Sequence, residues 1–249
     1  MSKRILIKAG IIVAVIVIAV AVPLLVGLSK ISNIELKIQN TEGPKILTET
    51  EILNELSKKY GNFLTYKRNK IDTDDIKEYL EHNDFIKNAV VSVSLTGELR
   101  ITIVQKTIIV RVYNKSNHNF YIDDEMDIIK TIKPVQCLTA IGDIKDNPVL
   151  HIDTIKNGDS KIIYDIATLI NADNLLKKWI SGIMKKDKNW FLIPTQGDYV
   201  IRLGDKKEWK EELEKLHYLI NYSFETQGWD DYEYIDLRFH NQIICGKYK

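Results

Sequence analysis

One uncharged stretch near the start of the chain limits where everything after it can fold. Residues 9–29 lie between Lys8 and Lys30 and contain no charged side chain. A helix of that length is roughly 31 Å long, which matches the hydrocarbon core of a bilayer. A buried helix of a globular domain seldom lacks polar positions over such a length. Residues 9–29 are therefore predicted to form a single membrane-spanning helix.

The charges that flank this segment predict its orientation. Lys3, Arg4 and Lys8 precede the segment, whereas the opposite flank opens with Lys30 alone. Because basic residues stay on the cytoplasmic side, residues 1–8 are expected to form a cytoplasmic tail, with the rest of the chain extracytoplasmic.

A cleaved signal peptide is the alternative, since residues 19–21 read Ala-Val-Ala. The apolar run continues to Leu28, which favours an uncleaved anchor. Both interpretations place the remaining residues outside the cytoplasm.

Composition narrows the class of protein. Hydrophobic residues make up 45% and charged residues 28%, as in ordinary globular proteins. The formal net charge is +1, so nothing indicates a nucleic-acid partner. With two cysteines, Cys137 and Cys245, a disulfide framework is excluded. One bridge between them stays possible, beside the simpler interpretation of two unpaired thiols.

Residues 32–104 predict a strand, two helices and a hairpin. Ile34, Leu36 and Ile38 alternate with polar residues, as in a half-buried strand. The first helix is expected from a capping box at Thr48 and Glu51 to a stop at Gly61. Its apolar stripe is Ile52, Leu53 and Leu56. The second helix is expected to start at Asp72 or Thr73 and to bury Ile76, Tyr79 and Leu80.

The hairpin that follows has the clearest pattern in the sequence. Its first strand places Ala89, Val91, Val93 and Leu95 on one face, Thr96-Gly97-Glu98 forms the turn, and Leu99, Ile101 and Ile103 alternate on the return strand. One face of a small sheet is therefore apolar, and two amphipathic helices are available to cover it.

Residues 105–249 predict a second, strand-rich domain with helices packed on its sheet. Strands are expected at "IIVRVYN", before the loop "NKSNHN", and in "FYIDDEMDII" and "WFLIPTQGDYVIRLG". Helices are expected at "DSKIIYDIATLINADNLL" and "KKEWKEELEKLHYLINYS", where apolar residues recur at helical spacing. The overall class is α+β: one N-terminal transmembrane helix, then two extracytoplasmic domains.

The β-α-α-β-β order directly after one anchor resembles a POTRA domain. The whole arrangement resembles the bacterial division family FtsQ/DivIB, most specifically in Tyr234-Ile235-Asp236-Leu237-Arg238-Phe239, which fits the family's "Y-x-D-L-R-[YF]" strand. The chain departs from the family pattern at Gly97-Glu98, where proline is frequent, and at residues 105–108, where Glu-Arg-x-Pro is common. It also has Met126 or Asp127 where the family usually has glycine.

No motif for catalysis or for a cofactor is recognised. The chain lacks a phosphate-binding glycine loop, a nucleophile elbow and a zinc-protease helix, and its five histidines are scattered. The acidic run at residues 123–127 lacks the glycine and distal glutamate of a calcium loop and is interpreted as a solvated turn. The carboxylates of "WDDYEYID" are likewise interpreted as a solvated face. The expectation is a protein that is not an enzyme, with no cofactor, metal, nucleic acid or small-molecule substrate.

The last segment, "YIDLRFHNQIICGKYK", predicts two strands joined by a turn at His240-Asn241. A short last strand is expected to be a sheet edge, to which an extended partner segment can add through main-chain hydrogen bonds. The family resemblance implies a scaffold in the bacterial inner membrane at the division septum, with FtsB-like and FtsL-like bitopic partners. It also implies that the FtsB-like chain docks on Ile243, Ile244, Cys245 and Gly246 and against Arg238 and Phe239.

Two other functions stay open. An anchored chaperone or transport component could bind client strands at the POTRA-like domain, but such proteins usually carry several of these modules and a β-barrel. An anchored hydrolase has only isolated carboxylates in its favour.

Overall fold

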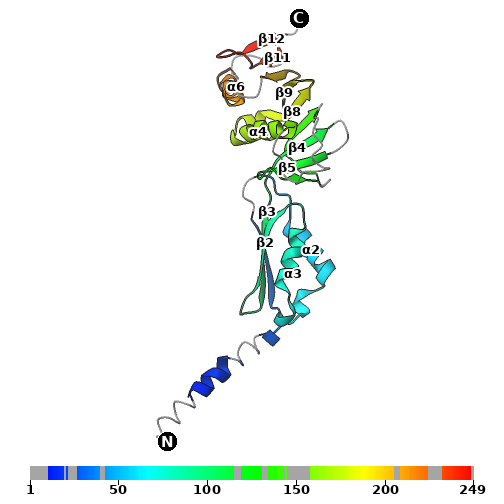
Figure 1. The fold of residues 1–249 in the computed structure, drawn as a ribbon, viewed down its shortest axis with the longest axis vertical. Helices are drawn as coiled ribbons and strands as arrows, with labels where there is room; N and C mark the ends of the chain where they lie inside the picture. The colour runs from blue at the N-terminus through cyan, green and yellow to red at the C-terminus, as the bar shows by residue number, and fades with distance from the viewer. Residues whose placement is uncertain are drawn as a thin grey trace. The chain divides into compact units, whose positions relative to one another are not determined.

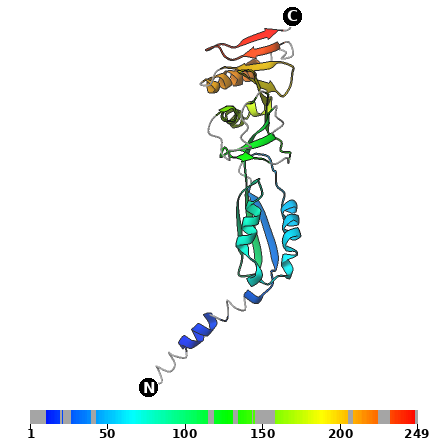
Figure 2. The ribbon, with the colours of Figure 1, turned by 45° about the vertical axis from the view of Figure 1, so that its right-hand side comes forward.

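A computed structural model describes residues 11–19, 21, 27–39, 43–114, 119–130, 134–142, 144, 158–204, 208–223 and 232–247. The chain divides into two compact units, one up to Gln105 and one from Lys106 onward, with residues 42–44 assigned to the second. Figures 1 and 2 show the ribbon of both units. Each is described separately.

The predicted membrane segment is described in part. Residues 11–19 are helical. None of the helices in the described ranges is both long and apolar enough to span a bilayer. The transmembrane helix over residues 9–29 therefore stays a prediction from the sequence.

The first unit contains a three-stranded sheet in the order β1-β3-β2. Its strands are β1 (Asn33–Gln39), β2 (Ile86–Val93) and β3 (Glu98–Gln105). β1 runs parallel to β3, and β2 runs antiparallel to it. Leu99, Ile101 and Ile103 of β3 are fully buried and form the centre of the core. The strand–helix–helix–hairpin order predicted from the sequence is confirmed.

Two helices, α2 (Glu49–Tyr60) and α3 (Thr73–Glu81), cover the apolar face of this sheet (Figure 1). α2 begins with the predicted capping box, in which Thr48 Oγ1 accepts from the Glu51 N–H and the Glu51 carboxylate accepts from the Thr48 N–H. Asp72 caps α3 by accepting from the N–H groups of Asp74 and Asp75. The 3₁₀ helices η1 (Phe63–Thr65) and η2 (Arg68–Lys70) join the two.

Two side chains of the first unit do not lie where the apolar pattern places them. Leu53 is exposed on α2, because Ile52 and Leu56 alone face the core. Leu95 lies beyond the end of β2 and is 84% exposed. The strand stops at Val93 because a turn begins at Ser94, whose carbonyl accepts from the Gly97 N–H. Leu95 therefore leaves the alternating series that ends at Val93.

The second unit is built on a nine-stranded sheet in the order β12-β11-β10-β9-β8-β7-β4-β5-β6. Its strands are β4 (Ile108–Asn114), β5 (Asn119–Asp123), β6 (Ile128–Ile129), β7 (Leu138–Gly142), β8 (Ile180–Lys186), β9 (Asn189–Pro194), β10 (Val200–Leu203), β11 (Tyr232–Asp236) and β12 (Ile244–Lys247). The pairs β4–β7, β7–β8 and β10–β11 are parallel, and the other pairs are antiparallel.

Three helices accompany this sheet: α4 (Gly158–Ala172), α5 (Leu176–Trp179) and α6 (Trp209–Ser223). α4 and α6 place their apolar stripes in one hydrophobic core with the sheet. The stripes consist of Ile163, Ile166, Ala167 and Ile170 on α4, and of Trp209, Leu213, Leu216 and Ile220 on α6. The predicted strand-rich domain with helices on its sheet is confirmed.

The sequence did not predict β7 and β8, which lie in the middle of the nine-stranded sheet. β8 ends in lysines, and Lys185 is nevertheless buried because its ammonium pairs with Asp159 at the start of α4. The predicted loop "NKSNHN" lies largely outside the described residues. Met126, at the position where the family usually has glycine, adopts the left-handed conformation with φ 66°.

Gly97 provides a test of the hairpin. Its φ is +88°, and an added Cβ would lie 2.9 Å from the Lys30 carbonyl oxygen. We expect Gly97→Ala to cost more than the roughly 1–2 kcal/mol of a left-handed non-glycine residue, because the Lys30 backbone must also move. Gly61→Ala is the matched control, with φ +79° and its nearest atom 3.9 Å away. Amide hydrogen exchange of β2 and β3 measures the difference. Equal losses of protection in the two variants would contradict the close approach.

Candidate partner-binding surface

β12 forms one end of the nine-stranded sheet (Figures 1 and 2). Within the part of the chain that the structure describes, it pairs with β11 alone. The register joins Ile244 to Asp236, Cys245 to Ile235 and Gly246 to Tyr234. A strand held on one side presents its other row of N–H and C=O groups outward.

One hydrogen bond between β10 and the end of β11 shows which backbone groups of β11 and β12 face each other. The Leu237 N–H donates to the Arg202 carbonyl of β10 over 3.1 Å, so the backbone of Leu237 faces β10. Because backbone groups alternate along a strand, Ile235 also faces β10, whereas Asp236 faces β12. The pair Asp236–Ile244 is then hydrogen-bonded, and Cys245 directs its N–H and C=O away from β11. The outward bonding position lies at Cys245, one residue after Ile244.

The structure places the six predicted docking residues at this edge or in the turn before it. Phe239 and Ile244 are 45% and 38% exposed, which leaves two apolar side chains beside the open backbone. Ile243 and Cys245 are half-buried and pack against the core. Gly246 lies where a Cβ would come within 2.3 Å of the Tyr234 ring, so the close approach of β12 to β11 requires a glycine there.

The sixth residue, Arg238, already binds a carboxylate of its own chain. Its Nε donates to Asp236 Oδ1 over 2.8 Å and its Nη2 to Asp236 Oδ2 over 2.6 Å. Residues two apart lie on the same side of an extended chain, which brings this pair together. A second carboxylate would therefore have to approach the guanidinium along its other edge, between Nη1 and Nη2.

Asp236 is the buried charge of the group, with a side chain 4% exposed. Burial raises the pKa of this carboxyl, but the hydrogen bonds and charge of Arg238, with the charge of Arg202, outweigh burial and leave the pKa lowered. Arg202 lies 3.7 Å from the carboxylate and also stacks on the Tyr234 ring. The hydrogen bond to Asp236 in turn raises the pKa of Arg238. The ion pair is thus present at physiological pH.

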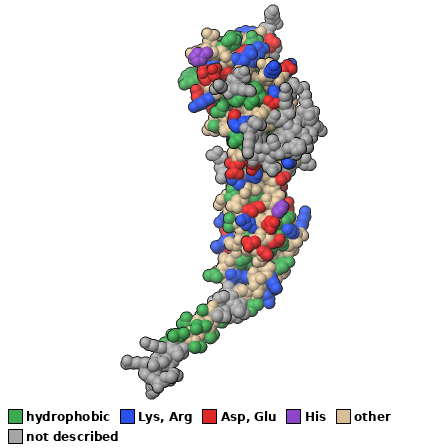
Figure 3. All heavy atoms as spheres, viewed as in Figure 1, with side chains coloured by type: hydrophobic (Ala, Val, Ile, Leu, Met, Phe, Trp, Pro, Cys, Tyr) green, Lys and Arg blue, Asp and Glu red, His purple; other side chains and the backbone are tan. Residues whose placement is uncertain are grey.

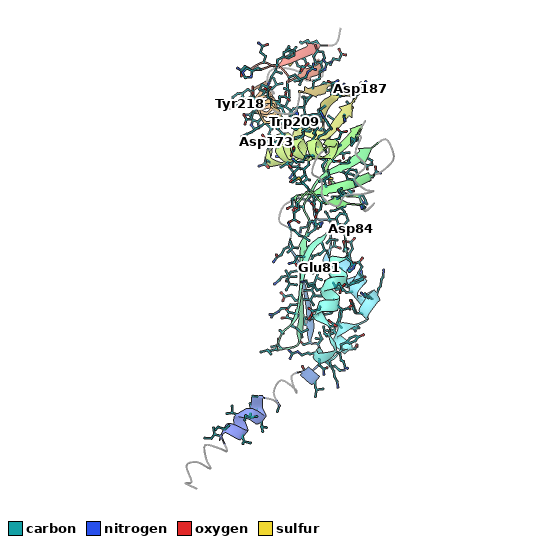
Figure 4. The ribbon with its side chains drawn as sticks, viewed as in Figure 1. Glu81, Asp84, Asp173, Asp187, Trp209 and Tyr218 are labelled. Carbon is teal, nitrogen blue, oxygen red and sulfur yellow. The ribbon has the colours of Figure 1, made fainter. Side chains whose placement is uncertain are left out.

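Two polar residues of α6 fix the loops at this end of the sheet. Lys215 Nζ donates to the carbonyls of Leu237 and Phe239, each over 2.7 Å, and so holds the turn between β11 and β12. The buried Glu212 carboxylate accepts from the Gly204 N–H after β10. Burial raises the pKa of Glu212. Trp209, labelled in Figure 4, donates from Nε1 to the Gly204 carbonyl.

A groove of about 490 Å³ lies between α6 and the end of α4. His217 Nδ1 and Asp173 Oδ2 lie 2.6 Å apart in this groove, and the exposed rings of Tyr218 and Tyr222 stack at 5.8 Å. Figure 4 labels Asp173 and Tyr218. These residues form a concave surface separate from the β12 edge.

The acidic run at residues 123–127 is solvated at Asp124 and Glu125, as the sequence predicts, but not at Asp123. Asp123 is fully buried, accepts from the N–H groups of Glu125 and Asp127, and lies 3.0 Å from Lys106 Nζ. No group of histidine, cysteine and carboxylate ligands that could hold a metal is found among the described residues. Asp236 is likewise buried, not part of a solvated face. Both cysteines are free thiols, and burial raises the pKa of Cys137 to about 11.

Comparison with known protein families gives two matches. Residues 107–246 match the family model described as "FtsQ/DivIB, C-terminal related". The chain belongs to the FtsQ/DivIB family. Residues 29–104 match the model of a POTRA-like domain. No curated protein matches the chain. These FtsQ/DivIB domains support a role as a cell-division scaffold, and the family suggests a membrane protein of the division site.

Within this FtsQ/DivIB domain, sequence reasoning missed the residues that support the edge. The apolar spacing that predicts α6 gives Lys215 and Glu212 no role of their own. The spacing of Asp236 and Arg238, two residues apart on one strand, was the available signal for their ion pair. Nothing local indicated that Lys215 bonds carbonyls more than twenty positions away.

Replacing Asp236 tests the ion pair. We expect Asp236→Asn to lower the free energy of unfolding at neutral pH by about 1–3 kcal/mol, since it removes charge-assisted bonds from a buried site. Because the pKa of Asp236 is lowered on folding, its contribution is present above the ordinary value of 3.8 and is lost as the pH falls through the folded value. The deficit of the variant should therefore shrink below pH 3.8, measured by urea titration of tryptophan fluorescence.

Glu233→Gln, at an exposed position of the same strand, is the control and should change stability by no more than about 0.5 kcal/mol. A deficit in Asp236→Asn that is the same at every pH would contradict the assigned ion pair.

Proposed function

We propose that this FtsQ/DivIB protein is a bitopic scaffold of the bacterial divisome that links FtsB-like and FtsL-like division proteins at the septum. Its N-terminal tail is cytoplasmic, residues 9–29 span the inner membrane once, and both extracytoplasmic units carry protein contacts. The predicted anchor and the family's division role support this arrangement.

The open edge of β12 is the observation that carries the proposal. The strand pairs with β11 on one side and directs the Cys245 backbone to the other. An extended segment of the FtsB-like partner adds there as a tenth strand, held by main-chain bonds that are the same for any sequence. Specificity comes from side chains, for which the exposed Phe239 and Ile244 provide apolar contacts.

Arg238 is given a different role from the one inferred from the sequence. Its guanidinium is neutralised by Asp236, so its first role is to hold the turn that leads into β12. A partner carboxylate binds only its remaining edge and shares the cation with Asp236. Charge contributes less to docking here than it would for an unpaired arginine.

A second candidate function rests on the other sheet. β2 pairs with β3 alone among the described strands, and Val90 is exposed on it. An anchored chaperone or transport component would bind client strands at this edge. The match of residues 107–246 to a division family favours the scaffold.

The edge is tested by binding of peptides from an FtsB-like protein to the full chain in detergent micelles. We expect micromolar or tighter binding, weakened about tenfold by Cys245→Pro, which removes the outward N–H donor. Cys245→Ala is the matched control, because it changes the side chain and keeps the donor. Isothermal titration calorimetry measures all three affinities.

Ile244→Pro is a further control with a different expectation. The Ile244 N–H faces β11, so this variant should destabilise the terminal hairpin itself. If Cys245→Pro binds as tightly as the unmodified chain, the partner does not add to β12. If the unmodified chain does not bind, the FtsB-like partner is wrong and the client-strand function gains support.

A further inference from the structure

Leu95 is the most exposed large apolar side chain of the described residues, and neither the core nor the β12 edge uses it. It lies at the tip of the β2–β3 hairpin. Figure 3 shows basic side chains around the lower end of the first unit, with apolar ones beside them. An exposed leucine close to basic side chains is suited to a partner that offers both an apolar contact and negative charge.

The hairpin tip is bonded to the residues where the predicted membrane segment ends. The Ser32 N–H donates to the Gly97 carbonyl over 2.8 Å, and Ser32 Oγ donates to the Thr96 carbonyl. Gly97 itself approaches Lys30 so closely that no Cβ fits between them. Leu95 is therefore held next to the point where the chain enters the domain.

The 3₁₀ helix η2 is bonded to the same point from another side. The Arg68 N–H donates to the Ser29 carbonyl over 2.9 Å, and Lys30 and Lys67 form a β-bridge. The Arg68 side chain donates from Nη1 to the Leu95 carbonyl. Entry segment, η2 and hairpin tip thus form one continuous surface, which we call the anchor-proximal surface. It consists of Leu28, Lys30, Lys67, Arg68 and Leu95.

Chain length fixes the distance of this surface from a bilayer. Ser29 is the last residue of the predicted membrane segment and is already bonded to η2. Residues 29–31, which lead from the predicted membrane segment into the domain, span at most about 10 Å even if fully extended. The headgroup layer on each side of the hydrocarbon core is about 5–7 Å thick. The Ile31 N–H also donates to the Tyr66 carbonyl over 3.0 Å. A domain bonded at Ser29 and Ile31 therefore has no linker that could hold its base clear of the headgroups.

We propose that the anchor-proximal surface seats the POTRA-like domain on the phospholipid headgroups around its own anchor. Leu95 and Leu28 enter the boundary between headgroups and acyl chains, and the exposed Lys30 and Lys67 bind the lipid phosphates, while Arg68 holds the hairpin tip through its bond to the Leu95 carbonyl. This is the arrangement expected where apolar and basic side chains share one face at a membrane surface. The proposal rests on the predicted anchor of the proposed function, but not on the partner at β12.

Quenching of tryptophan fluorescence by brominated lipid tests whether the anchor-proximal surface contacts the bilayer. The full chain with Leu95→Trp is reconstituted in vesicles whose phospholipids carry bromine on the acyl chains near the headgroup. The four natural tryptophans provide a background, measured on the unmodified chain. We expect about a twofold loss of the added fluorescence relative to unbrominated vesicles, since the ring would lie at the acyl boundary.

Val90→Trp is the matched control. It is also exposed, on the same hairpin, and lies three residues before Val93 at the end of β2, about 10 Å back from the turn that carries Leu95. Its fluorescence should be unchanged by bromination. Lys30→Gln with Lys67→Gln, added to Leu95→Trp, should reduce the quenching in vesicles that contain anionic lipid.

The outcomes separate the proposals. If the chain resists extraction by alkaline carbonate but neither tryptophan is quenched, the anchor stands and the seat is wrong. If both tryptophans are quenched equally, the domain lies on its side, and the anchor-proximal surface is not the contact. If carbonate extracts the chain, both the predicted anchor and the contact of the anchor-proximal surface with the bilayer are wrong. Docking at β12 is tested separately by the peptide titration.

Discussion

The second unit is built on an open sheet, and the strand at each end of that sheet has a row of backbone N–H and C=O groups with no neighbouring strand among the described residues. A strand bonded on one side exposes donors and acceptors that any other strand can use, so proteins usually shorten or cover such edges. β6, at one end of this sheet, has only two residues. β12, at the other end, has four residues, and two exposed apolar side chains lie on it or in the turn before it. The two ends therefore differ in the way expected if one is closed and the other is kept for a partner.

An open edge binds well only if it is already ordered, because ordering a loose strand on binding consumes part of the affinity. The polar groups behind β12 provide that order. Lys215 bonds two carbonyls of the preceding turn, and Asp236 holds Arg238 by two parallel bonds. The Asp236 carboxylate is buried, so losing its bonds to Arg238 would leave a charged group with little water to replace them. The turn geometry is thereby set before any partner arrives.

The features predicted correctly from the sequence are those whose cause lies within a few residues. The capping box at Thr48 and Glu51, the cap at Asp72 and the stripes of α4 and α6 each depend on neighbours one to four positions away. The features that were missed depend on partners far along the chain. β8 was not predicted because its lysines suggest a solvated segment, whereas Lys185 is buried in an ion pair with Asp159 on α4. The burial of Asp123 likewise depends on its ion pair with Lys106. Leu95 was misplaced because the turn at Gly97 ends the strand before the alternation of apolar residues does.

The open edge and the anchor-proximal surface use different forces, which makes their effects separable in one protein. The docking proposed at β12 depends on backbone bonds and apolar contacts, which salt weakens little. The proposed seat depends on the exposed cations Lys30 and Lys67, and such attraction falls within a screening length of about 8 Å at physiological ionic strength. Raising the salt concentration should therefore loosen the domain from the headgroups while leaving strand addition nearly unchanged. A shared salt dependence would mean instead that charge, not the open backbone, dominates the partner contact.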